Sequence, residues 1–251
     1  GGRLVFLAVG IFGMGLMLGL DTLVAQSYGA GRLDRCQYWL RHGVYLALIA
    51  AVPFSLLSFG LTATLPLWGL NDDVLQLALP YLNVVTLSVT PLLLYAAFRR
   101  YLQAVNLVRP ITFALLSANV VNVAVNWALI YGNLGFPALG ATGAAWATVI
   151  SRIYMAAVLL VAVREARRGR AWSEPGPHRV EWEALRRLLS LGGPAGLQIL
   201  LEVGVFAAAT ALAGRLAPAA LAAHQIAMNL WAFVFMVPLG LNAAGAVRVG
   251  Q

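Results

Sequence analysis

Apolar stretches of about 20 residues recur along the whole chain, and short polar segments separate them. Because a helix needs about 20 apolar residues to cross a hydrocarbon core of about 30 Å, each stretch predicts a transmembrane helix. The short alternating segments typical of a β-barrel are absent from the sequence. The pattern therefore predicts an all-α, polytopic membrane protein with seven spans, at residues 4–27, 43–68, 80–98, 110–131, 141–163, 193–213 and 219–245.

The arginines concentrate in a few polar segments, and their distribution predicts the orientation. Of the 17 arginines, 14 lie in residues 28–42, 99–109 and 164–190 or after the last span, whereas the opposite loops contain Arg3 and Arg215. The positive-inside rule makes the arginine-rich segments cytoplasmic. We therefore predict a multi-pass protein of the cell membrane, the inner membrane in a bacterium, with the N-terminus of the chain outside and its C-terminus in the cytoplasm.

Composition narrows the choice of protein class. The chain is 61% hydrophobic and 10% charged, whereas soluble domains average about 25% charged residues. The net charge of +8 would suggest nucleic acid binding in a soluble protein, but here the arginines form no face of an amphipathic domain. We interpret them as topology determinants and expect no nucleic acid partner. Cys36 is the only cysteine, which excludes an intrachain disulfide and a cysteine metal cluster.

A short internal repeat predicts the number of helices in the complete protein. Residues 18–21 (LGLD) return as residues 239–242 (LGLN), and Gly29 returns as Gly250, all at an offset of 221 residues. Both copies end spans on the same side, which indicates a parallel repeat of six spans and twelve in total. We therefore expect this chain to begin at the second helix and to lack the first and the last four.

Several strings along the chain resemble signatures of the MATE (multidrug and toxic compound extrusion) family. Their order and spacing carry the resemblance, which extends over nearly the whole chain. The strings are residues 20–31 (LDTLVAQSYGAG), 101–104 (YLQA) with Pro110, 132–135 (GNLG), 140–148 (GATGAAWAT), Pro194 with Gln198 and Glu202, 222–229 (AAHQIAMN) and 247–251 (VRVGQ).

The resemblance implies a fold and its division along the chain. Members of this family, which belongs to the MOP superfamily, are two-lobe helical bundles of twelve helices. Residues 1–163 would be helices 2–6 of the N-terminal lobe, and residues 191–251 would be helices 7 and 8, the start of the C-terminal lobe. Between them, residues 164–190 would form a cytoplasmic linker, which contains Pro175-Gly176-Pro177 and ends in an amphipathic piece at 180–189 that we expect to lie in the membrane interface.

The resemblance also implies a function. Proteins of this family are secondary antiporters, in which an inward Na⁺ or H⁺ gradient drives export of small amphipathic or cationic organic compounds. We expect a monomer that uses no cofactor other than the coupling ion. The glutamate at 202 favours the NorM-like branch over the DinF-like branch, whose proton site is an aspartate in the first helix.

Glu202 is the leading candidate for the coupling site. It lies near the middle of the sixth span, where a carboxylate costs at least about 2.5 kcal/mol, so it should face a cavity or a partner. Gln198, one turn earlier on the same face, can supply a neutral oxygen ligand for Na⁺ or orient the carboxylate. The resemblance favours a coupling role, and the alternative is a structural ion pair, for example with Arg152.

Amides and one histidine are candidates for the lining of the cavity. Asn119, Asn122 and Asn126 are spaced i, i+3, i+7 and so share one face of the fourth span. They can line a cavity or act as hydrogen-bonding links between helices. His224, near Asn229 in the seventh span, can sense protons or can have a hydrogen-bonded packing role, which we favour.

Four residues are gate or structural candidates. Asp21 lies near the cytoplasmic end of the first span, close in sequence to two arginines, so we favour a salt bridge over a coupling role. Arg152 sits near the middle of the fifth span, where pairing within the protein is favoured over contact with substrate. Pro91 and Pro238 lie inside spans and are candidate hinges, although most such prolines are packing features.

Two other functions have weaker support in the sequence. A lipid-linked precursor flippase of the same superfamily would need an arginine-rich central cavity, whereas Arg152 is the only arginine well inside a span. An intramembrane enzyme is suggested by Asn71-Asp72-Asp73, but an acidic Mg²⁺ motif needs further spaced aspartates, and no H-E-x-x-H or G-x-S-x-G string occurs. We therefore predict that the protein is not an enzyme.

Overall fold

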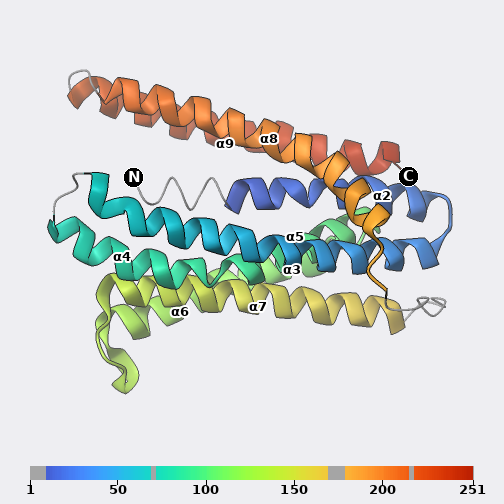
Figure 1. Cartoon of the computed structure of the whole chain (residues 1–251), viewed down its shortest axis with the longest axis horizontal. Helices are drawn as coiled ribbons and strands as arrows, with labels where there is room; N and C mark the ends of the chain where they lie inside the picture. Colours follow the sequence, from blue (N-terminus) through green and yellow to red (C-terminus); the bar gives the residue numbers. More distant parts are fainter. Residues whose placement is uncertain (1–9, 69–71, 169–178, 215–217, 251) are drawn as a thin grey trace.

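The computed structural model describes residues 10–68, 72–168, 179–214 and 218–250, and within them every regular element is a helix (Figure 1). Six helical segments are long and apolar enough to cross a membrane, and two shorter helices bent by 45° at a break make a seventh. The predicted all-α, polytopic fold with about seven spans is confirmed. The helices are α2 (Leu18–Gly29), α3 (Leu33–Thr64), α4 (Asp72–Thr86), α5 (Val89–Ala104), α6 (Arg109–Tyr131), α7 (Gly140–Arg168), α8 (Trp182–Ala213) and α9 (Pro218–Gly250), with 3-10 turns η1 (Leu65–Trp68) and η2 (Asn133–Gly135). The start of the first predicted span, the Pro-Gly-Pro loop, Asn71 and Arg215 lie outside the described residues.

Several helices extend well beyond the apolar stretches that predicted them. α3 begins at Leu33, ten residues before the predicted span, and α4 begins at Asp72 in what was expected to be a loop. A carboxylate in the first turn of a helix is stabilised by the positive end of the helix dipole, which accounts for the start of α4. Residues 182–189, expected as a separate amphipathic piece, are the first turns of α8, and Leu185 and Leu188 are buried in the core there.

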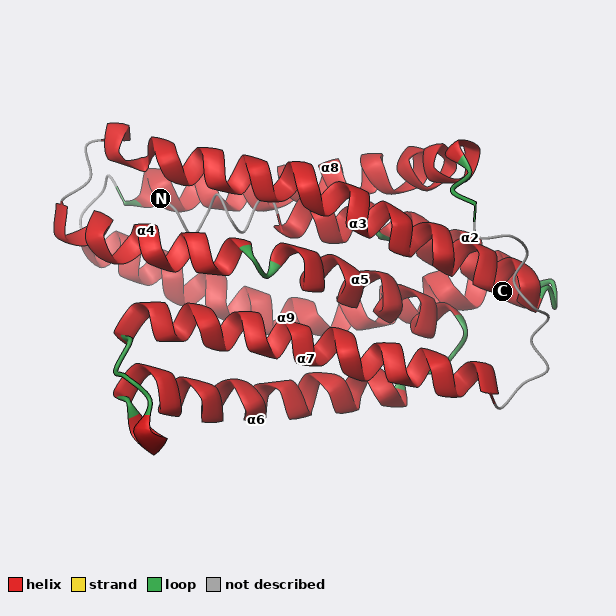
Figure 2. Cartoon of the chain, turned by 60° about the horizontal axis from the view of Figure 1, so that its bottom comes forward, coloured by secondary structure: helices red, strands yellow, loops and turns green. Residues whose placement is uncertain are grey.

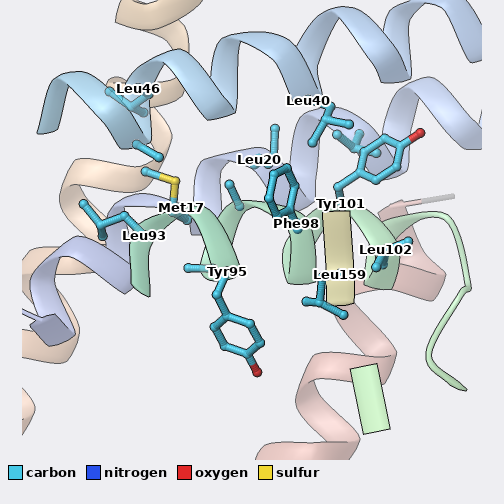
Figure 3. Packing of buried hydrophobic residues seen from close by; sticks show 14 of the residues in the cluster. Met17, Leu20, Leu40, Leu46, Leu93, Tyr95, Phe98, Tyr101, Leu102 and Leu159 are labelled. Atoms are coloured by element: carbon cyan, nitrogen blue, oxygen red, sulfur yellow. The ribbon is translucent and has the colours of Figure 1, made fainter. Parts of the chain in front are cut away.

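The core forms where α2, α3, α5 and α7 meet. α5 lies at its centre, because Tyr101 and Leu102 are completely buried there. Figure 3 shows side chains from neighbouring helices meeting around α5, among them Leu20, Leu40 and Leu159. These contacts join segments far apart in the sequence, so this part of the chain is a packed helical body.

The third predicted span is broken. α4 ends at Thr86 and α5 begins at Val89, and the two helices meet at 45°. Pro91, one of the two candidate hinges, is the third residue of α5 and has no N–H to donate to the carbonyl of Leu87 four residues earlier. The missing hydrogen bond weakens a continuous helix at this point, although α9 continues through Pro238, so the proline alone does not determine the break.

The helices form two groups: α2 to α7, and the pair α8 and α9. Both helices of the pair contact α2 and lie along one edge of the molecule in Figure 1, whereas in the turned view of Figure 2 α8 lies beside α3 and α9 lies behind α5. The contact is backbone to backbone: a Cβ on Gly192 would lie 1.9 Å from the carbonyl oxygen of Leu16, and one on Gly15 would lie 2.4 Å from the Cα of Gly196. Small residues permit this approach, as is common between membrane helices.

Large apolar side chains are exposed along whole helix faces. They include Leu56 and Val52 on α3 at 66% and 60% exposure, and Phe233 on α9 at 82%. A soluble monomer rarely exposes a contiguous apolar patch of more than a few hundred Å². These faces therefore have the character of surfaces that contact lipid or other membrane helices.

Candidate functional site

Asp21 is held by an arginine from a different helix than the sequence suggested. Its carboxylate Oδ2 accepts a hydrogen bond from Nη1 of Arg100 on α5 at 2.9 Å, and both side chains are about one-fifth exposed. The sequence pointed to Arg32 and Arg35, which are closer along the chain but are exposed. The pair links α2 to α5 within the first group of helices, which favours a structural role for Asp21.

Arg152 reaches the break between α4 and α5. Its Nη1 donates a hydrogen bond at 2.5 Å to the hydroxyl of Ser88, which is fully buried at that break. The Ser88 hydroxyl in turn donates to the carbonyl of Val85 in the last turn of α4. Pairing within the protein was favoured over contact with substrate, and the structure shows that Arg152 binds the side chain of Ser88, whose hydroxyl in turn bonds the backbone at the break.

The three asparagines on α6 are bonded mainly within their own helix. The Asn119 amide donates to the carbonyl of Leu115 at 2.8 Å, and the Asn126 amide donates to Asn122 Oδ1 at 2.9 Å. Asn119 is exposed, whereas Asn122 and Asn126 are half-buried. The three asparagines lie on one helix at the predicted spacing, and Asn122 and Asn126 are linked to each other.

Glu202 lies in α8, well inside a candidate membrane span that runs from Trp182 to Thr210. Both Glu202 and Gln198, one turn before it, are exposed. Within the described ranges no group of three or more His, Cys, Asp or Glu side chains is arranged to hold a metal ion. Among the described residues the candidate site is therefore one carboxylate with an amide one turn away.

An aromatic stack that the sequence interpretation missed lies next to this carboxylate. Phe206, one turn after Glu202, contacts Trp231 of α9 with ring centroids 4.8 Å apart, and Trp231 stacks on Phe235 at 4.7 Å with an angle of 15° between the rings. Trp231 is 41% and Phe235 36% exposed, so the stack presents ring surface. The i, i+4 spacing of Trp231 and Phe235 was the available signal.

The other candidates on α9 have different surroundings. Nε2 of His224, which is half-buried, lies 3.1 Å from the hydroxyl of Thr210 on α8, so the histidine joins the two helices. Asn229 is exposed. Pro238, the second candidate hinge, is also exposed, and α9 continues through it without a break.

Comparison with known proteins gives a consistent set of matches. The family model described as MatE matches residues 2–128 and 194–251. A probable multidrug resistance protein NorM of Bradyrhizobium diazoefficiens is 36% identical over 249 residues, which cover 96% of this chain and 52% of that protein. The multidrug resistance protein NorM of Vibrio parahaemolyticus is 31% identical, over 96% of this chain and 53% of the relative. The chain thus spans about half the length of the curated relatives it matches.

Solved structures show the same fold at lower sequence identity. The eukaryotic MATE transporter AtDTX14 superposes with a TM-score of 0.82 at 22% identity, over 96% of this chain and 53% of that one. A MATE in its complex with MaD5 superposes with a TM-score of 0.80 at 19% identity, over 98% and 56%. These matches are to transporters and not to enzymes. With the family model covering most of the residues and NorM relatives at 30–36% identity, the chain belongs to the MATE family of multidrug resistance transporters.

Proposed function

We propose that the protein exports small amphipathic or cationic organic compounds across the cell membrane in exchange for Na⁺ or H⁺, with Glu202 as the coupling site. The observation that carries the proposal is the exposed Glu202 carboxylate inside a candidate membrane span, beside an exposed amide and an aromatic stack. Such a carboxylate is costly to keep unless an ion, a proton or a partner compensates its charge.

The arrangement suits alternate binding of an ion and an organic cation. A proton or Na⁺ can neutralise Glu202, with Gln198 supplying a neutral oxygen. An organic cation can do the same, because its charge can lie at the carboxylate while its apolar part covers the rings of Trp231 and Phe235. Coupling follows if the ion and the substrate favour different conformations, since each then shifts the equilibrium toward the one it binds better.

The experiment replaces Glu202 with glutamine, which keeps the shape and removes the charge. The intact protein is reconstituted in liposomes, a Na⁺ or a pH gradient is imposed separately, and efflux of a fluorescent organic cation is followed. Ion-driven efflux should fall by about tenfold or more in Glu202→Gln, because the loss of a charged contact costs roughly 1.5–3 kcal/mol. The control is Glu165→Gln, which neutralises an exposed carboxylate near the end of α7. Unchanged efflux by Glu202→Gln, at equal protein in the membrane, would remove Glu202 from the coupling site.

The flippase alternative has less support. A cavity for lipid pyrophosphate needs converging arginines, whereas the guanidinium of Arg152 binds Ser88 at the α4–α5 break. The relatives named above are multidrug resistance proteins. Binding of a lipid pyrophosphate with no response to Na⁺ or pH in the same liposomes would favour the flippase.

A further inference from the structure

The first turn of α8 is attached to α3 by three polar residues. The Tyr38 hydroxyl donates a hydrogen bond to Oε2 of Glu181 at 2.6 Å, across 143 positions of the chain. The backbone N–H of Glu181 donates to Nε2 of His42 at 3.2 Å. Glu181 is the residue just before α8, so both bonds hold the point at which the chain enters the second group of helices.

His42 is the buried centre of this cluster. It is 1% exposed, and its ring lies 4.3 Å from the ring of Tyr38. Since Nε2 accepts the Glu181 N–H, the ring proton belongs on Nδ1, which donates to the carbonyl of Tyr38 at 2.9 Å. Both nitrogens of a buried imidazole are thereby satisfied, and one of them depends on a residue from the other group of helices.

The Tyr38 ring is fixed from its other side as well. The guanidinium of Arg35 lies 5.7 Å from the centre of the ring, within the range of a cation–π contact. Tyr38 also meets the ring of Trp39 edge-on at 5.1 Å. These contacts hold the Tyr38 ring in place, so its hydroxyl points at Glu181 although the bond lies at the protein surface.

The three residues lie at one end of the contact between the two groups of helices. The glycine contacts between the two groups lie in the first half of α8 and at the end of α9, where a Cβ on Gly250 would meet the Cβ of Ala25 at 3.1 Å. Tyr38, His42 and Glu181 lie at this same end of the bundle, the end where the arginine-rich segments gather. Any movement that separates the two groups at this end has to break the Tyr38 and His42 bonds to Glu181.

We propose that Tyr38, His42 and Glu181 form a latch that holds the arginine-rich end of the molecule closed, and that the transport cycle has to open it. Separation leaves Nε2 of the buried His42 without a donor, while the exposed Glu181 regains water, so the cost of opening falls mainly on His42. The latch itself is a property of the two groups of helices, and only its opening during transport rests on the proposed function.

The first test measures opening without ion or substrate. Every native cysteine, Cys36 included, is replaced by alanine, and Ala25, 2% exposed, becomes the reporter as Ala25→Cys. Tyr38→Phe removes the hydroxyl and keeps the ring. It should raise the rate of maleimide labelling at position 25 by about threefold to tenfold, as expected for the loss of one ordinary hydrogen bond at an exposed site.

Two further variants keep the result interpretable. Glu181→Ala should raise labelling to a similar extent, whereas Glu183→Ala, which removes an exposed carboxylate from the same first turn, should leave it unchanged. If Tyr38→Phe fails to fold, Glu181→Ala decides alone, because that side chain is exposed. Equal labelling in Glu181→Ala and the unsubstituted reporter protein would overturn the proposal.

The second test asks whether opening is needed for transport. Tyr38→Cys and Glu181→Cys are joined by a thiol-cleavable bismaleimide in the reconstituted protein. Export should stop and should return when the cross-link is cleaved, whereas each single-cysteine variant should export at the same rate before and after the same treatment. Full export by the cross-linked protein would overturn the latch, whereas absence of export from the wild type would count against the proposed function and leave the labelling result standing.

Discussion

The polar side chains have different surroundings in the two groups of helices. In α2 to α7 the charged side chains inside the bundle have partners within the protein: Asp21 has Arg100, and Arg152 has Ser88. In α8 and α9 the polar side chains Glu202, Gln198 and Asn229 are exposed along helices with little buried surface.

This contrast separates structural roles from binding roles. A charge satisfied by a fixed partner inside a packed bundle contributes to the fold, and exchanging it for an ion would leave the partner unsatisfied. The exposed faces of α8 and α9 have the character of surfaces that contact lipid or other membrane helices, so a charge on them can meet a ligand or a further helix. The contrast favours Glu202 over Asp21 and Arg152 as the site of coupling, and four substitutions test it, from the largest expected effect to the smallest.

Gly192→Ala tests whether the two groups depend on backbone contact. A Cβ at this position would lie 1.9 Å from the carbonyl oxygen of Leu16, so the helical turn before α2 and α8 would have to move apart, at a cost of about 3 kcal/mol. Thermal unfolding in detergent measures the loss as a lower midpoint. The matched control is Gly193→Ala, where a Cβ meets nothing within 4 Å and the helix should gain up to about 1 kcal/mol. Equal midpoints for the two variants would contradict the contact.

Asp21→Ala tests the structural role of the ion pair in the first group. It leaves Arg100 unpaired in a partly buried place and should lower the free energy of unfolding by about 2 kcal/mol, between the values for surface and buried pairs. In the double variant Asp21→Ala, Arg100→Ala part of that loss should be recovered. Strictly additive losses in the double-mutant cycle would show that the two side chains do not stabilise each other.

Trp231→Ala tests the open ring surface in the second group. The half-saturating concentration of a planar aromatic cation should rise about tenfold, because a stacked ring contact contributes roughly 1–2 kcal/mol. A compact aliphatic cation of the same charge should lose less, about threefold. Phe233→Ala is the control, since Phe233 is 82% exposed and belongs to no ring pair among the described residues. The same loss for both cations would argue against stacking.

Asn126→Ala has the smallest expected effect. It removes the hydrogen bond to Asn122 and should lower stability by about 0.6 kcal/mol, the typical value for a polar link in a membrane bundle. Asn119→Ala should change the unfolding midpoint less, because Asn119 is exposed and bonds the carbonyl of its own helix. A large drop in export by Asn126→Ala at unchanged stability would instead indicate that the stripe lines a cavity.

The sequence predicted local features, such as the helical spans, better than contacts between residues far apart in the chain. The helical class and the number of spans came from apolar windows and are confirmed, and the comparisons confirm the family. Helix ends were less accurate, because the start of α8 is amphipathic and becomes helical by packing Leu185 and Leu188 into the core. The partner of Asp21 was wrongly sought nearby, since sequence proximity favoured Arg32 over Arg100. The orientation and the role of Glu202 stay predictions.

By itself the sequence determined that this chain is a bundle of membrane-spanning helices, because hydropathy over a window of about 20 residues is a local property to which the bilayer responds directly. The family followed from the resemblance of its sequence strings, which the family model confirms. Only the tertiary structure decided which polar groups meet. It placed Arg152 at the break of the third span and brought Glu181 to Tyr38 across 143 positions. Such pairings depend on the directions in which whole helices pack, and no local pattern of residues contains that information.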